Sequence, residues 1–238
     1  MRERARLSGF ERVSRHLRHW RWLAVLVGIV LLALLFSQLS PAFLQLRNLQ
    51  NIAVQAAVTG VMAVGMTFII MTAGIDISVG GILYLTVAVV AWLTINVPGE
   101  ATILAAYPLA LLLGALLGAV NGAIVNLLGL NSLVTTLATL SIFRGLAIHI
   151  TEARILIPPD AVRFLGIGSI GGIPVPLIVA LLTVIVGIYL LNATRFGRHT
   201  LAIGASRRSA RESGLPVRRT LIMAYVAVGL CAGLAALI

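Results

Sequence analysis

The sequence predicts an all-α fold in which a bundle of helices crosses a membrane several times. Of its 238 residues, 60% are hydrophobic and only 11% carry a charged side chain, far from the composition of soluble domains. The apolar segments run for about 18 to 22 residues, the length that a helix needs to cross a bilayer. They lack the short alternating pattern of membrane β-strands, so we expect helices, in which every backbone group finds an internal partner.

A basic segment, 1–21, opens the chain, and apolar side chains recur along it at spacings of three and four: Leu7, Phe10, Val13, Leu17 and Trp20. This pattern is typical of an amphipathic helix on an anionic membrane surface, although a disordered basic tail explains it equally well. The apolar stretch that follows is longer than the core of a signal peptide and has no small-residue cleavage site after it. We therefore expect it to be the first span.

We expect seven spans, which together form one membrane domain over residues 22–238. Their predicted limits follow from the apolar runs and the breaks between them: 20–39, 52–73, 77–95, 103–127, 132–150, 176–191 and 221–238.

The second and third spans come from one apolar run, 52–96, which is too long for a single crossing. We expect it to break at the stretch TAGIDISVGG, where three glycines free the backbone: Gly74, Gly80 and Gly81. Asp76 and Ser78 can accept hydrogen bonds from the exposed N–H groups that open a new helix. An acid at membrane depth is costly to bury, so Asp76 is also a candidate functional residue, and the two roles are compatible.

The arginines predict the orientation of the chain. Segments 1–21 and 195–219 hold seven arginines each, and only four lie elsewhere. Six crossings separate the two clusters, so both lie in the cytoplasm, as the positive-inside rule requires. Counting 52–96 as one crossing would place the second cluster outside, so the charges independently support the break. Because topology explains the net charge of +11, no nucleic-acid partner is expected.

The sequence carries no motif of an enzyme or of a bound cofactor. It has no CxxC, HExxH, GxSxG or Walker pattern, so we expect no metal, no catalytic nucleophile and no ATP site. No run of membrane-embedded acids and histidines indicates a proton relay or cation site. Arg144 and His149 stand near the outer end of the fifth span, where snorkelling to the interface explains them. Any energy for work by this chain would come from a partner.

Most polar residues within the spans are neutral. Uncharged donors and acceptors suit an uncharged, hydroxyl-rich solute better than an ion. Hydrogen bonding between helices is the alternative role for each of them. Together with the two polar residues of the break, the candidates for a solute pathway are Gln55, Asp76, Ser78, Asn121, Asn126, Thr135 and Thr136.

Two further segments have candidate partners. Gly114, Gly118 and Gly122 recur at intervals of four in the fourth span and leave a bare face for close approach of another helix. That helix could belong to the same subunit or to another one. The connection 151–175 is rich in proline and glycine and balanced in charge, so it could dock an extracytoplasmic partner or form only a structured re-entry loop.

The connection 194–220 has the sequence TRFGRHTLAIGASRRSARESGLPVRRT, in which small residues are interleaved with arginines. A loop that only fixed the orientation of the chain would need no such small residues. We therefore expect a short helix that can fit closely into a cleft on another protein.

Three stretches carry a resemblance to a known family: NLQNIAVQAAVTGVMAVGMTFIIMTAGIDISVGGIL (48–83), NGAIVNLLGLNSLVTTLATLSIFRGLA (121–147) and GRHTLAIGASRRSARESGLPV (197–217). In this order and spacing they resemble permease subunits of bacterial ATP-binding-cassette importers for monosaccharides such as ribose, xylose, arabinose and galactose. The likeness covers most of the chain from about Pro41 onward. Relatives continue through further spans, so the resemblance implies that this chain is truncated at its C-terminus.

The resemblance implies a transport subunit and not an enzyme. Its partners would be a second permease in a homodimer or pseudodimer, a cytoplasmic ATPase pair, an external sugar-binding protein and the membrane lipid. Closure of the ATPases would rock the permease halves and alternate access to a central pathway. The third stretch is similar to the coupling loop that docks on the ATPase, and the positions carried over are Gly197, Arg198, Ala202, Gly204, Ser206, Ala210 and Gly214.

Two other functions remain open from the sequence. An ion-coupled secondary transporter of a small neutral solute would work without an ATPase, but the scarcity of acids in the spans argues against it. A membrane scaffold without transport activity is the second alternative. This chain also departs from the family pattern at Ser206, Arg207 and Ser209, where asparagine and acidic or small residues are usual.

Overall fold

The computed structural model describes residues 21–238, so most of the basic segment and its predicted amphipathic helix lie outside the described residues. The chain divides into two compact units, Met1–Ile52 and Ala53–Ile238. The first unit contains α2 (Arg21–Leu39) and the start of α3 (Leu46–Met71). A short turn joins them, in which the Phe36 and Phe43 rings lie 5.7 Å apart.

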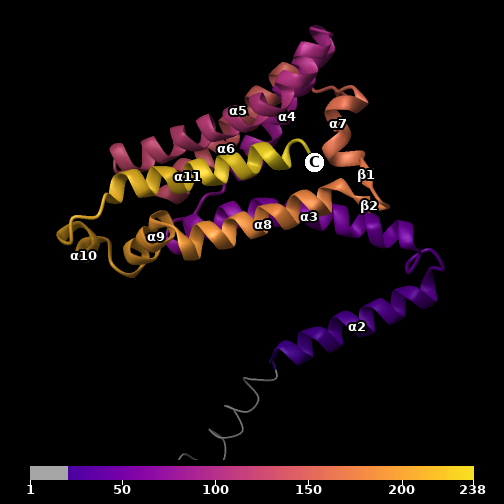
Figure 1. Ribbon diagram of the computed structural model, residues 1–238, viewed down its shortest axis with the longest axis horizontal. Coiled ribbons are helices and arrows are strands. Elements are labelled where there is room, and N and C mark those ends of the chain that lie inside the picture. Colours follow the sequence, from indigo (N-terminus) through magenta and orange to yellow (C-terminus); the bar gives the residue numbers. More distant parts are fainter. Residues whose placement is uncertain (1–20) are drawn as a thin grey trace, which may run out of the picture. The chain divides into compact units, whose positions relative to one another are not determined.

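The second unit is almost entirely helical (Figure 1). After α3 it contains, in chain order, α4 (Val79–Asn96), α5 (Glu100–Leu127), α6 (Ser132–Thr151), α7 (Asp160–Ile167), β1 (Ser169–Ile170), β2 (Ile173–Pro174), α8 (Val175–Ala193), α9 (Arg195–Ala205), α10 (Arg207–Glu212) and α11 (Val217–Ala235).

Six helices within residues 21–238 are long and apolar enough to cross a membrane: α3, α4, α5, α6, α8 and α11. They match the last six predicted spans to within a few residues, which confirms the all-α, membrane-spanning fold. The apolar stretch Leu23–Leu39, which is the part of α2 whose side chains are described, is not among these six. The first of the seven predicted spans therefore stays a prediction.

The glycine face of α5 packs against α11 of the same chain. The two helices run antiparallel, and a side chain on Gly118 would come within 3.0 Å of the carbonyl carbon of Tyr225 and 3.1 Å of Cα of Gly229. Gly114 and Gly122 meet the α11 backbone in the same way. The partner of this face, which the sequence left open, is thus a helix of the same subunit. Small residues allow the two backbones to approach closely.

Helices α4 and α6 run side by side in the same direction. Their shared core contains Ile82, Leu85 and Ala88 from α4 and Phe143 and Ala147 from α6. Residues with higher numbers in α4 contact residues with higher numbers in α6, so the two helices are parallel. The segment between α3 and α4 lies against this pair of helices.

The connection 152–174 is folded. Val162 of α7 is buried in a cluster with residues of α4 and α5, and the hydroxyl of Tyr107 donates a hydrogen bond of 2.5 Å to the carbonyl of Ala161. Strands β1 and β2 form an antiparallel hairpin whose turn places Gly171 and Gly172 in the left-handed region, at φ of 58° and 82°. The structured loop is therefore present, and docking of a partner there stays a prediction.

Candidate functional site

The long apolar run breaks where the sequence predicts, between α3 and α4. The left-handed residue at the end of α3 is Ala73, with φ of 57°, and not one of the three glycines. The N–H of Gly74 donates to the carbonyl of Ile69 at 3.0 Å, as at many helix ends that turn through a left-handed residue. Gly81 instead allows a close approach between helices, because a side chain there would lie 3.1 Å from the carbonyl oxygen of Leu140 in α6.

A buried polar network begins at Asp76. One of its carboxylate oxygens, Oδ1, accepts hydrogen bonds from the N–H of Ser78 at 2.8 Å and from its hydroxyl at 2.6 Å. The same hydroxyl accepts a bond of 2.6 Å from Nδ2 of Asn121 in α5. The three residues are 1%, 0% and 0% exposed. Asp76 thus accepts an N–H at the start of α4 as predicted, whereas the capping role predicted for Ser78 is wrong, because its hydroxyl binds other side chains.

Helix α6 holds the other side of the broken segment. The N–H of Ile77 donates to the hydroxyl of Thr136 at 3.1 Å, and the N–H of Ile75 donates to the hydroxyl of Ser132 at 3.5 Å. Four of the seven candidate pathway residues therefore meet at the break: Asp76, Ser78, Asn121 and Thr136. The network ties together the beginnings of α4 and α6 and the last turns of α5.

The other three candidates lie apart from this network. Gln55 is exposed on α3, and Nδ2 of Asn126 donates to the carbonyl of Gly122 in its own helix at 2.8 Å. The hydroxyl of Thr135 is buried, and the described part of the chain offers it no partner. The structure brings together four of the seven and gives these three separate surroundings.

Two acceptors of the network have no hydrogen-bond partner among the described residues: Oδ2 of Asp76 and Oδ1 of Asn121. Buried polar atoms are normally paired, so such atoms can bind water or the hydroxyl groups of a solute. Asp76 stands in the connection between two candidate spans, and its burial raises the pKa of its carboxyl group, although the bonds from Ser78 act in the opposite direction.

The segment predicted to couple to a partner packs directly against this break. A side chain on Gly204 of α9 would collide with the carbonyl oxygen of Met71, the last residue of α3. Nη2 of Arg207 in α10 donates to the carbonyl of Thr72 at 3.3 Å. This contact of Arg207 was not predicted, because no sequence pattern shows which of many arginines meets a residue far away in the chain. The two short helices thus contact the end of α3, four residues before Asp76.

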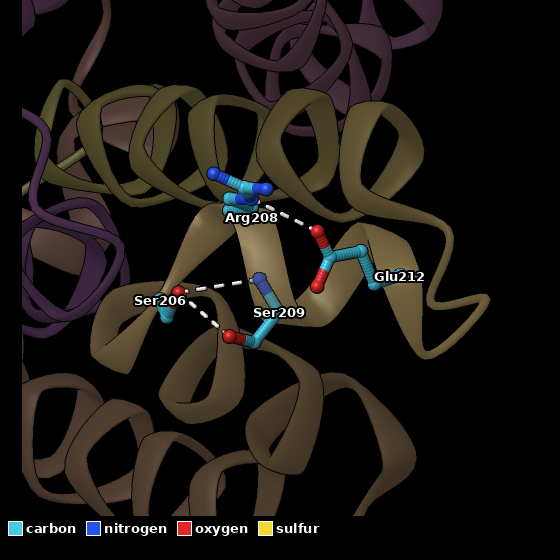
Figure 2. Close-up of polar contacts among 4 residues, drawn as sticks. All are labelled: Ser206, Arg208, Ser209 and Glu212. Carbon is cyan, nitrogen blue, oxygen red and sulfur yellow. Dashed lines mark hydrogen bonds and ion pairs between the residues drawn. The ribbon is translucent and has the colours of Figure 1, made fainter.

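Helices α9 and α10 are each fixed by a capping side chain. The hydroxyl of Thr194 accepts the N–H of Gly197 at 3.3 Å, and that of Ser206 accepts the N–H of Ser209 at 3.2 Å. Figure 2 shows the second cap, together with an ion pair of 2.9 Å between Arg208 and Glu212 on the exposed side of α10. Caps of this kind stabilise short helices that could not persist alone.

The small residues of this segment divide between two surfaces. Gly197, Gly204 and Ala210 face the chain itself: Gly197 meets the carbonyls that end α8, and Ala210 packs with Ile203, Val217 and Leu221. By contrast, Arg198, Ala202, Ala205, Arg208 and Ser209 are exposed. A partner would meet this second set, a basic surface with small side chains.

Six long apolar helices, a buried polar break and a capped basic helix pair beside it define an all-α, multi-pass membrane protein of the permease type. The family described as branched-chain amino acid transport system / permease component matches residues 48–238. The chain belongs to this family.

Curated relatives agree with this assignment. The chain is 38% identical over 219 residues to the D-allose transport system permease protein AlsC of Escherichia coli, an alignment covering 91% of this chain and 64% of that protein. It is 37% identical over 216 residues to the ribose import permease protein RbsC of Bacillus subtilis, covering 88% and 65%. It is 32% identical over 234 residues to the autoinducer 2 import system permease protein LsrD of Yersinia pseudotuberculosis, covering 93% and 68%. The chain thus spans about two thirds of the length of these relatives, and no solved structure matches it.

Proposed function

We propose that this protein is the permease subunit of an ATP-driven importer that carries a monosaccharide, a pentose, hexose or related polyol, across the bacterial inner membrane. The observation that supports this most directly is the contact between the α9–α10 helix pair and the broken segment. A force applied to α9–α10 from outside would act on Thr72, which precedes the first residue of the buried polar network, Asp76, by four residues. The named activities of the allose and ribose relatives support a sugar as the solute.

The arginines support an orientation for this arrangement. Arg198, Arg208 and Arg211 are exposed on α9 and α10, which favours a cytoplasmic position for this end of the second unit. The seven arginines of segment 1–21 likewise favour a cytoplasmic N-terminus. An ATPase would dock on the exposed basic surface there. The folded connection around α7 lies at the other end of the bundle, where a sugar-binding protein would dock (Figure 1). A second permease, in a homodimer, and lipid would cover the exposed apolar faces.

Uptake by the complete importer tests this function. The permease would be reconstituted into vesicles with an ATPase and a binding protein from the same organism, and uptake of labelled D-ribose and D-allose would be followed. We expect uptake that requires ATP and all three components. Uptake driven by a sodium or proton gradient without ATP would instead support the ion-coupled secondary transporter.

The Gly204→Leu variant is predicted to uncouple ATP hydrolysis from uptake. Leucine would collide with the carbonyl of Met71 and lift α9 from the end of α3, while the spans stay unchanged. We expect normal membrane insertion and ATP hydrolysis, with uptake reduced about tenfold or more, because coupling between two sites is typically worth about 1 to 3 kcal/mol. Gly60→Leu on α3 is the matched control for bulk, because a side chain at that position meets no other atom within 4 Å.

A second variant, Gly214→Leu, distinguishes the effect of a steric collision from the effect of backbone strain. Gly214 has φ of 75° and open space around it, so Gly214→Leu strains the backbone without any collision. We expect its uptake to fall less than that of Gly204→Leu. Unchanged uptake by Gly204→Leu would contradict the assigned coupling role of the α9–α3 contact.

A further inference from the structure

A hollow lies between α4 and α6, beside the broken segment. It has a volume of about 390 Å³ and is lined by Gly80, Gly81, Leu83, Tyr84, Leu140 and Arg144. Its size falls within the usual range for small-molecule sites. The two glycines leave room on the α4 side, and Tyr84, which is 45% exposed, supplies an aromatic ring.

Arg144 stands deep in the span. It precedes the end of α6 by seven residues, about 10 Å along the helix axis. Side chains on a helix tilt toward its N-terminus, and Arg144 accordingly lines a hollow shared with the first turns of α4. The contact between Gly81 and Leu140 places those turns beside the middle of α6. Arg144 thus lies beside the start of α4, and snorkelling to the outer interface, the interpretation based on the sequence, stays a prediction.

The charge of Arg144 has no partner within the described residues. It makes no ion pair or hydrogen bond with any of residues 21–238, and it is exposed on the surface of the bundle. An unpaired arginine facing lipid at this depth is costly, so we expect this face to be in contact with water or a polar ligand.

The described residues of a second copy of this chain would not supply the missing partner. The acidic residues of the sequence are Glu3, Glu11, Asp76, Glu100, Glu152, Asp160 and Glu212. Among the described ones, Glu100 opens α5, Glu152, Asp160 and Glu212 lie in connections or short helices, and Asp76 is only 1% exposed. None could approach Arg144 from outside at its depth in the span.

We infer that this hollow, the Tyr84–Arg144 hollow, is a binding site for a hydroxyl-rich neutral solute within the membrane. The inference rests on the proposed import function and names the site that the solute occupies. The planar guanidinium of Arg144 can donate to two adjacent hydroxyl groups, and the ring of Tyr84 packs against the carbon skeleton. Gly80 follows the buried Ser78 by two residues, so a movement of the broken segment would reshape the hollow.

Labelling of a single cysteine tests the site without ATP or any partner. In a Cys231→Ala background, Gly80→Cys, which keeps both Tyr84 and Arg144, would react with a charged, membrane-impermeant thiosulfonate reagent. Gly80 lines the hollow, and a side chain there meets no other atom within 4 Å. The matched control is Leu181→Cys on α8, which is 61% exposed on an apolar surface. We expect Gly80→Cys to react about tenfold faster, because charged reagents are excluded from lipid. D-Ribose or D-allose should slow the reaction, whereas dimethyl sulfone at equal osmolality, which is neutral and has no hydroxyl group, should not.

Adding Arg144→Gln to Gly80→Cys should raise the sugar concentration for half-protection about tenfold, and Arg144→Lys should raise it less, since one charge-assisted hydrogen bond is lost or weakened. An unchanged value in both variants, with normal elution on gel filtration, would overturn the role of Arg144. Reaction as slow as at Leu181→Cys would show that this face contacts lipid and would overturn the proposed site. Spontaneous disulfides between copies would show that the face is an interface between subunits and would overturn it as well. A fast reaction that neither sugar slows would overturn the proposal that the hollow binds a hydroxyl-rich solute. Each of these results is independent of whether ATP-driven uptake is observed.

Discussion

The Gly118→Leu variant is expected to lose most of its folded stability. Gly118 lies at the centre of the contact between α5 and α11, and any side chain there would collide with the carbonyl oxygen of Tyr225. Backbone atoms cannot rotate away as a flexible side chain can, so the two helices must separate along their length. We expect the free energy of unfolding to fall by about 3 kcal/mol, or folding to fail outright.

Thermal unfolding of the purified protein in detergent would measure this effect. A loss of about 3 kcal/mol corresponds to a fall in Tm of roughly 10 °C for a chain of this size. Gly60→Leu on α3 is the matched control, because no atom lies within 4 Å of a side chain built there. Leucine favours a helix more than glycine does, so the control should be neutral or slightly stabilised. Equal losses in the two variants would show that the α5–α11 contact is not what makes Gly118 necessary.

The sequence predicted the helices and the break well, because both depend on local properties. Apolar runs of a given length form spans, and Asp76 among glycines and a serine marks a place where a helix must restart. The glycine spacing in α5 likewise predicted a close contact. The glycine spacing could not identify α11 as the partner helix, because a helix face without side chains can pack against many other helices. Only the folded chain decides which one covers it.

The contacts within the candidate site were less predictable, because they too depend on how the whole chain folds. Residue types showed that Asp76, Ser78, Asn121 and Thr136 were polar in an apolar setting, but not that they bind one another while Gln55 and Asn126 lie elsewhere. The bond between Arg207 and Thr72 joins residues that are 135 positions apart. The position of Arg144 in its span was predicted to within one residue, but the sequence could not show that its side chain lines a hollow with the start of α4.

The Asp76→Asn and Asp76→Leu variants are expected to differ sharply. Asparagine keeps an oxygen that can accept the N–H and the hydroxyl of Ser78, whereas leucine leaves both buried donors unpaired. Each such donor costs about 1 to 3 kcal/mol, so Asp76→Leu should be strongly destabilised and should lose uptake.

The pKa of Asp76 predicts how the asparagine variant compares with the natural protein as the pH changes. Burial raises this pKa in the folded state, so the folded protein holds its proton to a higher pH than the unfolded chain does. The free energy of unfolding therefore falls as the pH rises from the ordinary pKa range of aspartate through the pKa of Asp76 in the folded state. Above that pH, the ionised carboxylate of Asp76 destabilises the folded protein. Asp76→Asn has no such penalty, so its Tm should equal or exceed that of the natural protein at pH 7, and the difference should shrink toward pH 4. A loss of Tm and uptake in Asp76→Asn as large as in Asp76→Leu would show that the negative charge itself is required.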